Sequence, residues 1–189
     1  MTKLAVCGFD PSLRNWGVAI GLYDLESHKL TITHIDVIQP VLSKAKQIRQ
    51  NSLDVDASRQ LFQAAYKHAT GAQAVFAEVP VGSQSSRAMA SYGICTGVIG
   101  SLQSSGIPVI EISPTEVKLA ACGNRTATKE QMIAWATKAH PEANWPTYNQ
   151  KGTAIVSEAK AEHMADAIGC IYAGIASNPF QQLLNFQRV

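Results

Sequence analysis

The chain opens with strand-like segments in direct succession, and this start limits the folds open to it. Residues 3–9, 16–23 and 30–38 are largely apolar runs separated by short polar turns, which indicates an antiparallel meander. Farther along, strand-like runs at 73–79 and 108–112 alternate with helical patterns. Because such alternation is typical of parallel pairing, the order predicts an α/β fold with a mixed five-stranded sheet, an antiparallel meander of three strands, and helices on both faces.

Several helix ends are marked in the sequence. Ser113 to Glu116 form a capping box with proline at the first helical position, and Thr128 to Gln131 repeat the capping pattern for the next helix. Gly123 is expected to end the first of these two helices. Other helices are expected to end at Gly71 and to cover residues 85–102 and 157–176, with loops over 41–54 and 145–153.

The length of 189 residues suits one well-buried domain, so residues 1–189 are expected to form a single globular domain. The cysteines are widely separated and form no CxxC pair, which favours reduced core residues over a zinc site or a disulfide framework: Cys7, Cys95, Cys122 and Cys170. No leader pattern and no membrane-spanning apolar stretch is present. A cytoplasmic protein is therefore expected.

The net charge of +2 is low for a nucleic-acid-binding protein. Any contact with DNA must come from local clusters of basic residues rather than from bulk charge. Candidates for such contacts are Lys44, Lys46, Arg49, Arg87, Lys118, Arg125 and Lys129.

Acidic side chains lie where they suit metal binding. Asp10 follows the first apolar strand, and Glu78 lies inside the apolar run 74–79, where a carboxylate is costly without a cation. His163 and Asp166 are three residues apart and share one face of the last long helix. Carboxylates with one imidazole suit Mg²⁺ or Mn²⁺ better than zinc, and two such ions support hydrolysis of a phosphodiester.

Each of these residues also has a purely structural interpretation. An Asp before Pro is often a turn former, a Glu in an apolar run can lie at a sheet edge, and a helical His is more often structural than a ligand. The metal-site hypothesis gains over these alternatives because all of the residues occur in the order and contexts that one fold requires.

The chain resembles the RuvC family of Holliday-junction resolvases, which has the ribonuclease H-like fold. The resemblance rests on segments in family order at residues 8–17, 76–79, 113–118, 123–124, 128–131 and 163–167. It implies a homodimer that makes paired nicks in four-way DNA, with a dimer symmetry that matches the junction. It also implies that metal and catalysis depend on Asp10, Glu78, His163 and Asp166, and that DNA phosphates are approached by Lys118 and Lys129, with Arg87 and Arg125 as further candidates.

The chain departs from the family pattern at several positions. His163 stands where many members carry Asp, and Ser12 where many carry glycine. The segment after Glu78, residues 79–84, lacks the aromatic that bacterial members often carry there. Viral relatives of the family act on a wider range of branched DNA, and the missing aromatic suggests a likeness to them. The resemblance thus implies the cytoplasm of a bacterial cell or of a virus-infected host.

Other functions compete with this interpretation. The nearest is another ribonuclease H-like nuclease that acts on flapped or branched DNA or on RNA–DNA hybrid, since the same metal site would serve it. Actin-like ATPases and sugar kinases share the strand-Asp-turn start but need a second lobe for which the chain leaves little room. A non-catalytic DNA-binding relative would be expected to have a broken acidic set, and this set is intact.

Overall fold

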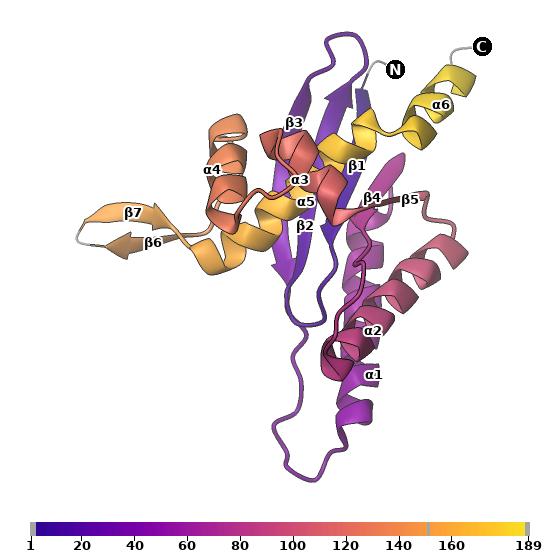
Figure 1. Ribbon diagram of the computed structural model, residues 1–189, viewed down its shortest axis with the longest axis vertical. Helices are drawn as coiled ribbons and strands as arrows, with labels where there is room; N and C mark the ends of the chain where they lie inside the picture. Colours follow the sequence, from indigo (N-terminus) through magenta and orange to yellow (C-terminus); the bar gives the residue numbers. More distant parts are fainter. Residues whose placement is uncertain (1–2, 151, 188–189) are drawn as a thin grey trace.

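A mixed sheet forms the centre of the molecule (Figure 1). The computed structural model describes residues 3–150 and 152–187. The meander consists of β1 (Lys3–Asp10), β2 (Trp16–Asp24) and β3 (Leu30–Ile38), and the parallel strands are β4 (Ala74–Glu78) and β5 (Val109–Ile112). The strand order β3-β2-β1-β4-β5 places β1 at the centre, with β2 antiparallel and β4 parallel to it. The predicted five-stranded α/β sheet is confirmed.

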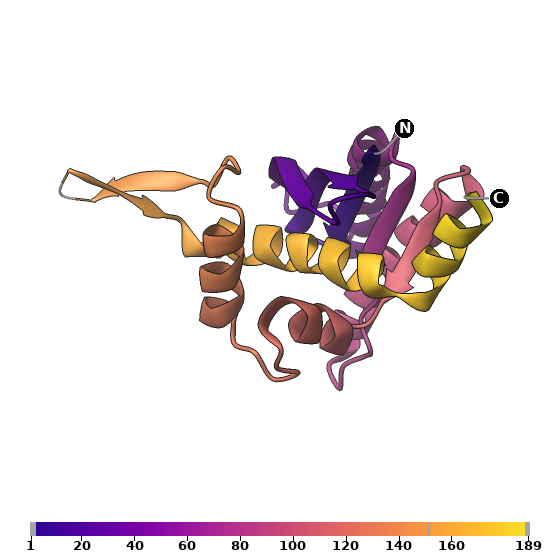
Figure 2. The same ribbon diagram turned by 90° about the horizontal axis from the view of Figure 1, so that it is seen from above.

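Helices cover both faces of this sheet, as Figure 2 shows. One hydrophobic core lies between the sheet and the helices α1 (Gln50–Ala69) and α2 (Ser86–Ser104). The other face carries α3 (Pro114–Cys122), α4 (Lys129–Ala139), α5 (Glu158–Ala176) and α6 (Asn178–Gln187). None of the helices in the described part of the chain has the length and apolar character needed to cross a membrane.

The helix α5 lies directly against the strands because glycines face it. A Cβ added at Gly8 would lie 2.1 Å from the carbonyl oxygen of Ala167, and one added at Gly17 would lie 2.1 Å from the carbonyl oxygen of His163. Only glycine leaves room for a helix backbone at this distance. The strand–glycine contacts therefore fix the position of α5 over β1 and β2.

The helix ends follow the predicted caps. Both capping boxes form. The Ser113 and Thr128 side chains each accept a hydrogen bond from the backbone N–H three residues later, and the side chains of Glu116 and Gln131 accept one from the backbone N–H of the capping residue. Gly123 ends α3 in the left-handed conformation, with φ of 66°. The predicted starts of α3 and α4 are thus confirmed.

The prediction of a loop over residues 145–153 is largely wrong. β6 (Thr147–Gln150) and β7 (Thr153–Val156) pair as an antiparallel hairpin that projects from the body (Figure 1). The alternation typical of a half-buried strand is missing from this stretch, because an arm that projects into solvent has no core face to bury. The helix α6 was also not predicted, and Lys151 lies outside the described residues.

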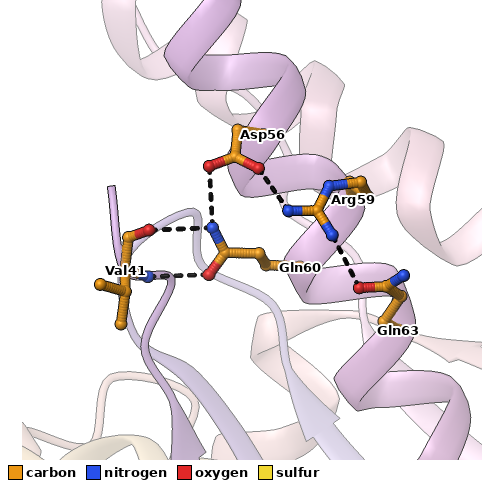
Figure 3. A network of polar contacts seen from close by, with 5 residues as sticks. All are labelled: Val41, Asp56, Arg59, Gln60 and Gln63. Atoms are coloured by element: carbon orange, nitrogen blue, oxygen red, sulfur yellow. Dashed lines mark hydrogen bonds and ion pairs between the residues drawn. The ribbon is translucent and has the colours of Figure 1, made fainter. Parts of the chain in front are cut away.

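The prediction of a loop over residues 41–54 places the end of the loop too late in the chain. The helix α1 already begins at Gln50, and its N-cap, Arg49, makes no side-chain capping bond, so no start signal was present in the sequence. The segment before it is held by Gln60, whose side chain accepts the Val41 N–H and donates to the Val41 carbonyl oxygen, each at 2.9 Å (Figure 3). A third bond, of 2.9 Å, from Gln60 Nε2 to Asp56 Oδ2 orients this amide along α1.

Candidate active site

Three elements bring the predicted catalytic residues to one end of the sheet. Asp10 is the last residue of β1, and Glu78 is the last residue of β4. Because β1 and β4 are parallel neighbours, both side chains lie at the same sheet edge. His163 and Asp166 lie one helical turn apart on α5, which packs on β1, β2 and β4.

Asp10 and His163 are directly joined. The Asp10 Oδ2 atom lies 2.7 Å from His163 Nδ1, and both side chains are largely buried. The hydrogen bond to the Asp10 carboxylate, more than the opposing effect of burial, raises the pKa of His163. This contact requires the close seating of α5 on Gly17, since Gly17 lies opposite Asp10 in the β1–β2 ladder.

Glu78 and Asp166 are largely buried carboxylates, and neither has a hydrogen-bond partner among the described residues. Burial first, and then the charges of Asp10 and Asp166, raise the pKa of Glu78 to about 8. Burial, followed by the charges of Asp10 and Glu162, raises the pKa of Asp166 to about 7. Without an added cation, these two groups therefore tend to retain protons near neutral pH.

The donor set fits a hard divalent cation. Three carboxylates and one imidazole converge here, and two of the carboxylates are largely buried with too little positive charge around them. Within the described residues, no three His, Cys, Asp or Glu side chains are already arranged around a common ion position. The Asp10–His163 hydrogen bond is one reason, because it occupies two of the atoms that would bind a metal.

A cavity of about 440 Å³ opens beside these carboxylates. Glu78 and Asp166 line it together with Lys118 and Lys129, so the structure brings both predicted lysines to the acidic residues. The charge of Lys118 lowers the pKa values of Glu78 and Asp166 against the larger effect of burial. The cavity thus combines carboxylate oxygens, the atom type that divalent metals prefer, with cations suited to a phosphate backbone.

The two lysines differ in their partners. Lys129 Nζ lies 2.5 Å from Glu162 Oε1, and this contact raises the pKa of Lys129. Lys118, which is half-buried, makes no ion pair with any described residue. The Lys129–Glu162 pair joins α4 to α5 and was not predicted, because such a long-range ion pair has no periodic signal in the sequence.

The two predicted arginines do not line this cavity. Arg87 makes a bidentate pair with Asp54 at 2.6 and 2.7 Å, which joins α2 to α1. Arg125 is exposed between α3 and α4. The remaining basic candidates, Lys44, Lys46 and Arg49, are exposed before α1.

One residue that lines the cavity was not predicted from the sequence. Tyr92 on α2 lines the carboxylate cavity and also a second cavity formed with residues 11–15. The available signal was weak: a tyrosine among small and polar residues in a helix whose apolar face is otherwise narrow.

Comparisons with known proteins agree with this architecture. No protein-family model matches the chain. A curated relative, "Crossover junction endodeoxyribonuclease RuvC" from Anaeromyxobacter dehalogenans (strain 2CP-C), is 32% identical over 135 residues, which span 70% of this chain and 68% of the relative.

Two solved structures have the same fold. The structure of T. thermophilus RuvC in complex with Holliday junction substrate has a TM-score of 0.63 at 17% identity, covering 90% of this chain and 94% of that chain. The fowlpox virus Holliday junction resolvase has a TM-score of 0.51 at 15% identity, covering 90% of this chain and 96% of that chain.

Proposed function

This chain belongs to the RuvC family of crossover junction endodeoxyribonucleases, and we propose that it cleaves four-way DNA junctions by paired nicks. The observation that carries the proposal is the set of carboxylates at one sheet edge, beside a cavity that also holds Lys118 and Lys129. The largely buried acids favour a hydrolytic metal site, and the nearby cations suit a DNA phosphate as the substrate group.

Nucleases of this family depend on a divalent metal, and we assign its binding to Asp10, Glu78, His163 and Asp166. Mg²⁺ is the proposed ion, with Mn²⁺ as an accepted substitute and two ions in each site. Bound ions of this kind activate water and stabilise the leaving oxygen of a phosphodiester. Burial favours the protonated forms of Glu78 and Asp166, and metal binding would release those protons. The two side chains would therefore be fully ionised only with the metal bound.

The basic residues are proposed to position the DNA. Lys118 has no ion pair among the described residues, so it is the first candidate for a phosphate contact. Lys129 becomes available when Glu162 releases it. Arg87 and Arg125 stay candidates for outer contacts, although Arg87 would first have to leave Asp54.

We further propose a homodimer built from single nuclease domains of residues 1–189. Paired nicks across a two-fold symmetric junction need two active sites related by the same symmetry, and one chain carries one set of these carboxylates. The molecular mass of the purified protein in solution, measured with and without junction DNA, tests this assembly. The cytoplasmic location stays a prediction.

The direct test is a cleavage assay on labelled substrates with and without Mg²⁺. We expect symmetric nicks in a four-way junction and little cleavage of linear duplex. Preferential cleavage of flapped duplex or RNA–DNA hybrid would instead favour the competing nuclease function. Glu26→Gln, a substitution of an exposed acid in the β2–β3 turn, is the matched control and should retain full activity.

A further inference from the structure

Tyr92 forms a shared wall between two cavities. One is the carboxylate cavity that Glu78 and Asp166 line. The other, of about 450 Å³, is lined by residues 11–15, directly after Asp10, and by residues at the start of α2. The predicted catalytic carboxylates are therefore flanked by two hollows, and the aromatic ring of Tyr92 borders both.

The side chain of Tyr92 has no partner within the described part of the chain. Its hydroxyl makes no hydrogen bond and its ring stacks on no other ring there. Tyr172, the other half-buried tyrosine in the described part of the chain, differs, because its Oη lies 3.0 Å from His140 Nε2. A half-buried tyrosine usually finds a hydrogen-bond or ring partner, so Tyr92 is available to a ligand.

The direction of Tyr92 is fixed by its helix. Cys95, one turn later on the same face of α2, is buried in the core. The first turn of α2 is held by the Ser85 cap and by the Arg87–Asp54 pair. Tyr92 therefore lies on a rigid element at the boundary between the core and the site.

The second cavity has the composition that a nucleobase requires. Leu13, Ala88 and Cys95 supply apolar surface, and Arg14 and Asn15 supply polar groups. Asn15 Oδ1 already accepts a hydrogen bond of 2.8 Å from Gln39 Nε2, which leaves its amide nitrogen as a donor. A nucleobase presents flat apolar faces and polar edges, which suit the second cavity. The phosphate is joined to the base through one sugar, so the adjoining carboxylate cavity can hold the phosphate of the same nucleotide.

We propose that Tyr92 stacks on the nucleobase next to the scissile phosphate and so helps to determine where branched DNA is cut. This inference rests on the proposed function, because it assumes that the carboxylate cavity receives the phosphate. Stacking on tyrosine tolerates every base, and contacts from the rim of the second cavity add discrimination between bases. The bases at a branch point suit such a site, because a crossover interrupts the stacking of the duplex.

The test places 2-aminopurine, whose fluorescence is quenched by stacking, at successive positions around the mapped cleavage point of a four-way junction. In metal-free buffer, binding of the wild-type protein should change the fluorescence at one position beside the scissile phosphate. Tyr92→Leu should abolish that change, whereas Tyr92→Phe should retain it. The control Tyr66→Leu removes an exposed aromatic ring from α1 and should leave the signal unchanged.

Cleavage and stability measurements complete the test. Tyr92→Leu should weaken junction binding by about 10-fold or more and broaden the preference for bases at the cut, with thermal unfolding close to that of Tyr92→Phe. A signal that persists in Tyr92→Leu, or no responsive position in a wild-type protein that cleaves junctions, would overturn the stacking role alone. Failure of the wild-type protein to bind and cleave junctions would overturn the proposed function and this inference together.

Discussion

The two halves of the acidic site differ in how their charges are compensated. In the first half, Asp10 at the end of β1 is paired with His163 at 2.7 Å. In the second half, Glu78 and Asp166 are largely buried with no hydrogen-bonding partner in the described part of the chain, and their pKa values are raised to about 8 and about 7. In the first half the charge of Asp10 has a partner without metal, whereas in the second half ionised carboxylates would need a bound cation. The proposed metal site would thus be partly preformed and partly dependent on its ion.

Removing either half should stop the chemistry. Asp10→Asn and Glu78→Gln each delete a proposed metal-binding oxygen, and we expect cleavage to fall by more than about 100-fold, since even groups that only support a metal ligand contribute up to that much. Junction binding should remain, because phosphate contacts do not require these carboxylates. Single-turnover cleavage and electrophoretic mobility shift measure the two effects. Near-normal nicking by either variant would refute the site assignment.

The same two variants should differ in stability. The pKa of Glu78 in the folded protein is raised from an ordinary value of 4.5 to about 8, so the fold favours the protonated acid. The contribution of protonated Glu78 to the free energy of unfolding is fully present below pH ~4.5 and is lost as the pH rises through about 8. In metal-free buffer, Glu78→Gln should therefore stabilise the protein by about 2–4 kcal/mol at pH 8.5 and by little at pH 5.

Asp10→Asn should not show the gain in stability that we expect for Glu78→Gln. It weakens an existing bond to His163, so we expect no comparable stabilisation at high pH. Urea unfolding at both pH values distinguishes the variants. Equal stabilisation by Asp10→Asn and Glu78→Gln would show that the two halves are not compensated differently.

The close packing of α5 that joins the two halves can be tested by adding a methyl group. Gly17→Ala would place a Cβ 2.1 Å from the His163 carbonyl oxygen, so α5 must move, and we expect a loss of about 1–3 kcal/mol together with reduced cleavage. The control is Gly97→Ala on α2, where a Cβ has no neighbour within 4 Å. That change should be neutral or stabilise by up to about 1 kcal/mol. Thermal unfolding of both variants measures the difference.

His163 gives the first half a response to pH. An imidazole must be neutral to bind metal, and the hydrogen bond to Asp10 raises its pKa, so protons and Mg²⁺ should compete for it. The Mg²⁺ concentration for half-maximal cleavage should rise as the pH falls from about 7 to 6. His163→Asp should retain activity with a flatter dependence. An unchanged dependence would exclude His163 as a ligand and direct attention to Glu162.

The sequence predicted the parts of this site that follow from local patterns and strand order. Asp10 and Glu78 could be placed together because each follows an apolar run and a helical crossover makes their strands parallel. His163 and Asp166 could be placed on one face by their spacing. The Lys129–Glu162 and Arg87–Asp54 pairs could not be predicted, because each joins residues far apart in the chain through surface geometry. Tyr92 was missed for the same reason, since its role depends on which cavities meet at α2.

The smallest expected effects concern the two lysines beside the acidic site. Lys118 has no ion pair among the described residues, so Lys118→Ala should reduce the slope of log affinity against log salt by about one unit and weaken binding equally for all junction sequences. Lys129→Ala should change the slope less, because Lys129 must leave Glu162 before it meets a phosphate. Glu162→Gln should correspondingly strengthen binding, since it frees Lys129 and removes a negative charge from the cavity. Salt titrations of junction affinity for the three variants test this order. Equal slopes for Lys118→Ala and Lys129→Ala would mean that the Glu162 contact does not limit Lys129 when DNA binds.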